Sequence, residues 1–126
     1  MRRRTCLAAL AAAGATLGAP PANPIQLHVD LDVDPTKEKE LVANFRKVFR
    51  PTISKQPGFV SVRLLKLRQA IAGAAPPNAP YRLVISFQTE EQRQTWVASD
   101  EHQRAWPAIE GTLTGSKVTA VLYDTV

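Results

Sequence analysis

The chain has 126 residues, a length typical of one domain, and 44% of them are hydrophobic and 21% charged, as in soluble globular proteins. Sixteen basic residues against 11 acidic ones give a formal charge of +5, but three of the basic residues are Arg2, Arg3 and Arg4. Without them the balance is 13 against 11. This small excess argues against a nucleic-acid partner.

Residues 1–22 have the layout of a secretory signal peptide: a basic start, an apolar run from Cys6 to Ala19, and a small-residue zone before Asn23. The apolar run is shorter than the roughly 20 residues that span a bilayer, so we expect no stable membrane insertion. Arg3-Arg4 also fits a loose twin-arginine pattern. We therefore expect export to the periplasm or the exterior and a mature domain of residues 23–126. The alternative is a cytoplasmic protein with a disordered N-terminal tail.

The first half of the mature domain reads as strand, helix and strand. Apolar residues at every second position predict a strand over residues 25–33. Asp34-Pro35-Thr36 favours a helix start, and apolar residues at helical spacing continue to Ile53. Pro51 is expected to kink or shorten the last turn.

A turn at Gln56-Pro57-Gly58 leads into a strand of about Phe59 to Arg68. Leu64-Leu65 interrupts its alternation and indicates a bulge. A small-residue, proline-rich loop over 70–80 precedes a third strand at Tyr81 to Phe87.

The second half contains two helix starts and a final strand. Thr89-Glu90-Glu91-Gln92 has the spacing of a capping box, and Asp100-Glu101-His102-Gln103 repeats that pattern. Pro107 is expected to bend the second segment or begin a new turn, and Gly111 or Gly115 to end it. Residues 117–124 predict the last strand.

The resulting order, β-α-β-β-α-β, predicts an α+β, ferredoxin-like fold with an antiparallel sheet and helices on one face. The strands carry apolar residues on both faces, for instance Leu65 and Leu67 against Val62 and Leu64. An uncovered sheet face with apolar side chains favours a partner, so we expect a homodimer.

The stretch from Trp96 to Trp106 gathers both tryptophans and His102 within about three helical turns. Large aromatic side chains beside an imidazole suit a pocket for a flat organic molecule. Trp96 and Trp106 are candidate pocket walls, and His102 is a candidate base for a phenol or hydroquinone. The alternatives are helix anchors for the tryptophans and a solvated helix position for His102.

Other polar residues are weaker candidates. His28, on the polar side of the first strand, is a second candidate base or part of a structural network with Asp30. Arg63 and Arg82 are candidates for stabilising a substrate anion, or else pair with carboxylates. The remaining candidate polar contacts are Asn44, Tyr81 and Tyr123.

No metal or cofactor is expected. The Asp30-Asp32-Asp34 row lacks neighbouring histidines and reads as a solvated strand edge. The sequence has no dinucleotide fingerprint, phosphate loop, His-Glu-x-x-His motif or Gly-x-Ser-x-Gly elbow.

Four stretches in this order resemble the antibiotic biosynthesis monooxygenase family: residues 31–40, Gln56-Pro57-Gly58-Phe59, Tyr81 into Glu91, and Trp96 to Trp106 with Ser99 and His102. The resemblance covers the chain from Pro24 to Val126. It implies a dimeric α/β barrel of two ferredoxin-like subunits, each with a pocket between sheet and helices. Characterised members include cofactor-independent oxygenases of phenols, quinol oxygenases and haem-degrading enzymes.

The haem-degrading subgroup fits poorly. Trp96 matches its tryptophan, but Trp106 stands at the position of the iron-binding histidine and Val29 at or near that of the asparagine. The resemblance therefore favours a cofactor-independent monooxygenase acting on a small phenolic or quinol-type molecule with dioxygen. The alternatives are an exported, non-catalytic module that binds a small hydrophobic ligand, and a haem-binding protein.

Overall fold

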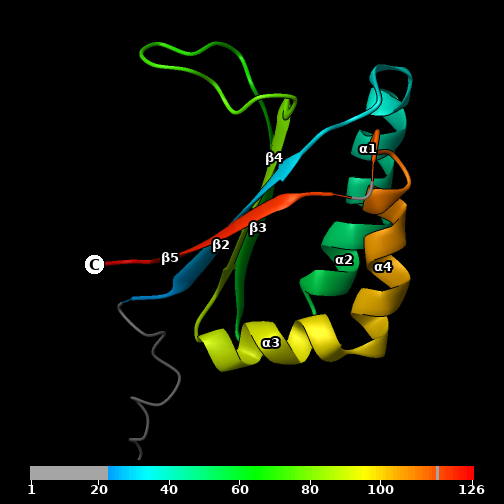
Figure 1. Cartoon of the computed structure of the whole chain (residues 1–126). Coiled ribbons are helices and arrows are strands. Elements are labelled where there is room, and N and C mark those ends of the chain that lie inside the picture. The colour runs from blue at the N-terminus through cyan, green and yellow to red at the C-terminus, as the bar shows by residue number, and fades with distance from the viewer. Residues whose placement is uncertain (1–22, 116) are drawn as a thin grey trace, which may run out of the picture.

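The computed structural model describes residues 23–115 and 117–126, and the expected signal peptide lies outside these residues. The strands are β2 (Ile25–Leu31), β3 (Phe59–Lys66), β4 (Tyr81–Phe87) and β5 (Thr119–Asp124). They form an antiparallel sheet in the order β3-β4-β2-β5. Helical segments connect β2 to β3 and β4 to β5, which confirms the predicted ferredoxin-like order (Figure 1).

The first helical region consists of η2 (Pro35–Lys37), α1 (Glu38–Asn44), η3 (Phe45–Phe49) and α2 (Arg50–Ile53). It begins as predicted, because the Asp34 carboxylate accepts a hydrogen bond from the Thr36 amide at 2.8 Å.

Pro51 does not shorten this helical region, which continues to Ile53. A proline ring clashes with the carbonyl four residues earlier in a regular α-helix. Here the preceding segment η3 is a wider π-helix, in which the Arg50 amide donates to the Phe45 carbonyl five residues back. The helix therefore accommodates Pro51 by local widening.

The second helical region is divided into α3 (Glu90–Ala98) and α4 (Asp100–Glu110). The capping box at Thr89 is confirmed: its hydroxyl accepts from the Gln92 amide, and the Gln92 side chain accepts from the Thr89 amide, each at 3.2 Å. The N-cap of α4 is Ser99, one residue before the predicted Asp100. Ser99 has extended backbone, so α4 runs in a different direction from α3 (Figure 1).

Pro107 lies inside α4 without ending it, and Gly111 caps the helix end as predicted. Two strand details differ from the prediction. The bulge lies at Val60, where the pairing passes from Phe59 opposite Phe87 to Ser61 opposite Ser86, whereas Leu64 and Leu65 pair regularly. The strand after α4 begins at Thr119, two residues later than predicted.

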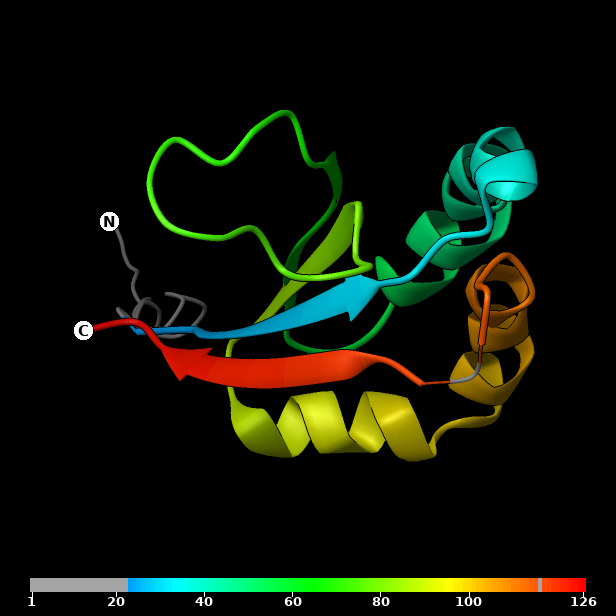
Figure 2. The ribbon, with the colours of Figure 1, turned by 45° about the horizontal axis from the view of Figure 1, so that its top comes forward.

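The core lies between the helices and one face of the sheet. The core side chains that are at most 1% exposed come from both layers: Leu31, Leu83 and Phe87 from strands, and Leu41, Phe49, Ile53 and Ile109 from helices. The opposite face, called here the open face, carries exposed Leu65, Val121 and Tyr123. Figure 2 shows α3 beneath the sheet and the β3–β4 loop on the other side. None of the helices in the described parts of the chain is long and apolar enough to cross a membrane.

Candidate functional site

A small hollow lies where α3 and α4 meet the core side of the sheet. Its volume is about 140 Å³. We call it the aromatic cavity, and its lining includes Leu27, Phe49, Ile85, Trp96, His102 and Trp106. The structure thus brings together both tryptophans and one of the two candidate histidines.

The three rings of the candidate stretch pack against one another. The His102 ring stands edge-on to Trp96 at 5.0 Å between centroids and nearly parallel to Trp106 at 6.3 Å. Phe49 contacts both indoles edge-on, at 6.0 and 6.4 Å. Trp96 is 2% exposed, so it anchors α3 to the core and also walls the cavity. The two interpretations of the tryptophans are therefore compatible.

The break at Ser99 sets the position of His102. The Ser99 hydroxyl accepts a hydrogen bond from the His102 amide at 3.2 Å and donates one to the Trp96 carbonyl at 2.7 Å. This cap fixes the imidazole on the first turn of α4, facing the end of α3. His102 is half-buried, not the solvated helix residue of the alternative interpretation.

Burial affects both the hydrogen bonding and the pKa of the His102 imidazole. Its Nδ1 atom is buried and has no hydrogen-bond partner among the described residues. Burial lowers the pKa of His102 below its ordinary value of 6.5, so the ring is neutral near pH 7. A buried polar atom without a partner is unusual in a folded protein and marks this side chain for a functional interpretation.

Arg93 also lines the cavity, and sequence reasoning missed it. Its guanidinium forms two hydrogen bonds of 2.6 Å with Glu90 and holds the pKa of that carboxyl at about 2. The signal was available, because Arg93 precedes Trp96 by three positions and residues so spaced share a helix face. Because the Glu90 carboxylate is ionised and paired with Arg93, the two charges offset each other at this wall.

His28, Arg82 and Tyr123 lie on the open face, away from the aromatic cavity. His28 contacts the Gln26 side chain at 2.9 Å and the Tyr123 ring at 4.8 Å. Arg82 pairs with Asp30 at 2.7 Å, so Asp30 is not the solvated strand-edge residue that was predicted. These residues form a polar network on the sheet, apart from the aromatic cavity.

Asn44 and Arg63 also lie apart from the cavity. The Asn44 amide donates to the Ala108 carbonyl at 2.9 Å and joins α1 to α4. Arg63 is exposed on the edge strand β3. Among the described residues no three His, Cys, Asp or Glu side chains are grouped to hold a metal ion.

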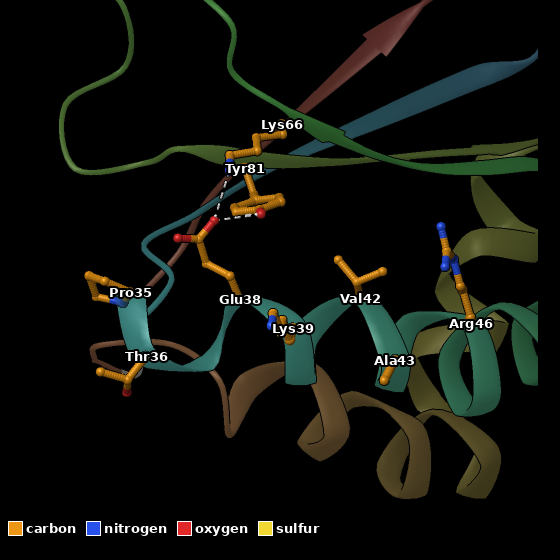
Figure 3. A pocket seen from close by; sticks show the side chains of 9 residues that line it. All are labelled: Pro35, Thr36, Glu38, Lys39, Val42, Ala43, Arg46, Lys66 and Tyr81. Atoms are coloured by element: carbon orange, nitrogen blue, oxygen red, sulfur yellow. Dashed lines mark hydrogen bonds and ion pairs between the residues drawn. The ribbon is translucent and has the colours of Figure 1, made fainter.

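A larger hollow lies elsewhere, between α1 and the ends of β3 and β4 (Figure 3). It measures about 780 Å³ and is widely open to solvent. Glu38 is held there by the Tyr81 hydroxyl at 2.8 Å and the Lys66 ammonium at 3.0 Å. This hollow contains neither an imidazole nor an indole, so its size alone does not make it the site for phenol chemistry.

A model of the family described as antibiotic biosynthesis monooxygenase matches residues 24–107, two thirds of the chain. The chain belongs to this family. A comparison with curated protein sequences finds no match.

Solved structures agree with the family fold. A putative antibiotic biosynthesis monooxygenase from Caulobacter crescentus is 17% identical, with a TM-score of 0.66 over 82% of this chain and 91% of that one. SnoaB, a cofactor-independent oxygenase from Streptomyces nogalater, is 15% identical, with a TM-score of 0.56 over 80% and 89%. A dimeric ferredoxin-like protein of unknown function from Jannaschia is 14% identical, with a TM-score of 0.64 over 82% and 98%. At these identities the likeness establishes the fold alone.

Proposed function

We propose that this member of the antibiotic biosynthesis monooxygenase family is a cofactor-independent monooxygenase of a small phenolic or quinol-type molecule. The observation that carries the proposal is that His102, whose Nδ1 atom is buried without a partner among the described residues, lines a cavity walled by two tryptophans. The similarity of the fold to SnoaB, itself a cofactor-independent oxygenase, supports it.

In the proposed reaction the neutral His102 ring accepts a proton from the substrate hydroxyl. The resulting phenolate is electron-rich enough to reduce dioxygen. For a simple phenol, one oxygen atom becomes the new carbonyl of a quinone. The other leaves as water with the hydroxyl hydrogen and the ring hydrogen that the new oxygen replaces.

The cavity volume sets the size of the substrate. A cavity of about 150 Å³ lined by apolar side chains holds one benzene molecule. The aromatic cavity, at about 140 Å³, therefore suits a single ring, and fused two- or three-ring molecules exceed it. We propose a one-ring phenol or hydroquinone as the substrate class.

Oxygen uptake by the purified protein tests this proposal. Phenols and hydroquinones of one, two and three fused rings are compared at equal concentration, with the enzyme-free rate subtracted. We expect the one-ring compounds to be oxidised at least tenfold faster and one atom of ¹⁸O₂ to enter the product. Uptake that favours three-ring substrates would contradict the size argument, and no uptake with any compound would contradict the monooxygenase.

A non-catalytic binding module is the second candidate. It is favoured by the predominantly apolar lining, in which His102 and Arg93 are the two titratable side chains. In that case one-ring phenols would quench tryptophan fluorescence, because Trp96 and Trp106 wall the cavity, but no oxygen would be consumed.

A further inference from the structure

A second candidate site lies between α1 and β3, apart from the aromatic cavity. The hollow of about 780 Å³ between α1 and β3 shares Val42, Arg46 and Tyr81 with a neighbouring hollow of about 350 Å³. Together they form one groove, called here the α1–β3 groove. None of the residues that line it also lines the aromatic cavity.

The groove concentrates positive charge. Residues 23–126 contain 13 basic and 11 acidic residues, yet five basic side chains and one carboxylate line this groove. The basic residues are Lys39, Arg46, Arg50, Arg63 and Lys66, and the carboxylate is Glu38. Clustered like charges repel one another unless a bound anion offsets them.

The single carboxylate does not offset the arginines. Figure 3 shows Glu38 directed at Lys66 and Tyr81, and these contacts lower the pKa of its carboxyl. Arg46, Arg50 and Arg63 form no ion pair with any described carboxylate.

Arg46 and Arg50 are four residues apart on the first helical region. Arg63 belongs to the edge strand β3, where the register places it on the same face as Leu65 and Arg82, so it lines the groove from the edge of the sheet. Arg50 lies over the Phe45 ring at 5.5 Å, which holds its guanidinium beside the groove. Planar guanidinium groups bind carboxylate and phosphate oxygens in pairs.

Between these charges the groove is apolar. Val42, Val62, Leu64 and the ring of Tyr81 line the part that joins the two hollows. The larger hollow alone, at about 780 Å³, lies within the roughly 300–1,000 Å³ range of small-molecule sites. A small inorganic anion would leave this apolar surface uncovered.

We propose that the α1–β3 groove binds an amphipathic organic anion. Its phosphate or carboxylate group contacts Arg46 and Arg50, with Arg63 at the edge of the groove, and its apolar part lies along Val42 and Tyr81. The site is separate from the aromatic cavity and does not depend on the monooxygenase proposal.

Isothermal titration calorimetry of the purified protein tests the site with four probes: octyl phosphate, octanoate, inorganic phosphate and neutral octyl glucoside. We expect one equivalent of octyl phosphate or octanoate to bind at least tenfold more tightly than inorganic phosphate or octyl glucoside. The stronger of the first two identifies the preferred head group. Equal binding of octyl glucoside, or no saturable binding of either amphipathic anion, would overturn the proposal.

Variants locate the binding. Arg46→Gln and Arg50→Gln should each weaken octyl phosphate binding about tenfold or more, whereas Arg104→Gln, an exposed arginine on α4 outside the groove, should not. A one-ring hydroquinone should not displace octyl phosphate, because the two hollows share no residue. Equal weakening in all three variants, or displacement by the hydroquinone, would place the anion elsewhere and contradict the proposal.

Discussion

The two histidines of the chain show how the fold gives one residue type two different environments. His28 and His102 are both half-buried, and each has a buried Nδ1 atom without a partner among the described residues. His28 lies on the open face beside the Arg82–Asp30 pair. His102 lies against the indoles of the aromatic cavity. Only His102 is therefore placed to act on a ligand in that cavity.

The pH dependence of the proposed reaction follows from the lowered pKa of His102. Because the folded value lies below 6.5, the base is neutral above that pH and becomes protonated as the pH falls through its folded pKa. We expect kcat/KM to stay level above pH 6.5 and to fall in more acid solution. An acid limb with its midpoint above pH 7 would contradict the assignment.

The same shift affects stability. In the unfolded chain His102 takes up a proton at about pH 6.5, whereas in the folded chain it does so only at lower pH. The free energy of unfolding therefore declines as the pH falls from the unfolded pKa of His102 through its folded pKa. Urea unfolding should show that the wild type loses more stability than His102→Gln between pH 7 and pH 5. Parallel losses in the two proteins would show that His102 does not contribute to this decline.

Trp96 supports the fold as well as the cavity, because its side chain is 2% exposed and packs on Phe49. We expect Trp96→Ala to lower the free energy of unfolding by about 3–5 kcal/mol, the usual cost of truncating a buried large aromatic. Trp96→Phe should recover most of that loss. Urea unfolding measures both variants, and a loss below about 1 kcal/mol in the alanine variant would contradict this packing.

Part of the candidate site could be predicted from the sequence at the level of single residues. The proximity of His102 and Trp106 follows from their spacing of four residues on one helix. The sequence could not show that Ser99 breaks the helix, which decides how His102 faces Trp96. Nor could the sequence show that Arg63 and Arg82 both lie outside the aromatic cavity, because their positions depend on strand order and register.

At the level of elements, the turn before β3 packs against the capping box of α3, because Gly58 in the turn lies next to the Gln92 side chain. This glycine has a φ of +80°, a left-handed conformation that side chains disfavour, and a Cβ there would collide with the Gln92 side chain. That side chain completes the α3 cap at Thr89.

Gly58→Ala should therefore lower the free energy of unfolding by about 2 kcal/mol, through backbone strain and the displaced cap. Thermal and urea unfolding measure the loss. Gly73→Ala is the matched control for strain alone, because Gly73 also has a positive φ but a Cβ there meets nothing within 4 Å. Equal losses in the two variants would show that the Gln92 contact adds nothing.

Element boundaries were predictable where local chemistry sets them, as at Asp34, Thr89 and Gly111. The π-helix before Pro51 and the bulge at Val60 were not. The first depends on how a long helical region accommodates a proline, and the second on how β3 pairs with β4.

At the scale of the whole molecule, the open face is the feature that a monomer leaves unexplained. It carries Leu65, Val121 and Tyr123, all more than 40% exposed, around a polar centre with His28 and the Arg82–Asp30 pair. We propose that two copies pair through this face, as the resemblance to a dimeric α/β barrel implies. The export of the protein, predicted from the signal-peptide pattern of residues 1–22, is a separate proposal.

Light scattering of the mature domain tests the dimer. We expect twice the monomer mass for the wild type and the monomer mass for Val121→Lys, because a lysine charge is costly to bury in the contact. Lys117→Ala, two residues before β5 begins, should keep the dimer mass. A monomeric wild type would contradict this arrangement.

The central claim is that His102 in the aromatic cavity activates a one-ring phenol or hydroquinone for reaction with dioxygen. The most direct measurement is oxygen uptake by His102→Gln and His28→Gln beside the wild type, with substrate binding followed by tryptophan fluorescence. The account predicts a loss of roughly 10²- to 10⁴-fold in rate for His102→Gln, with binding retained, and a nearly wild-type rate for His28→Gln. A wild-type rate in His102→Gln would contradict it.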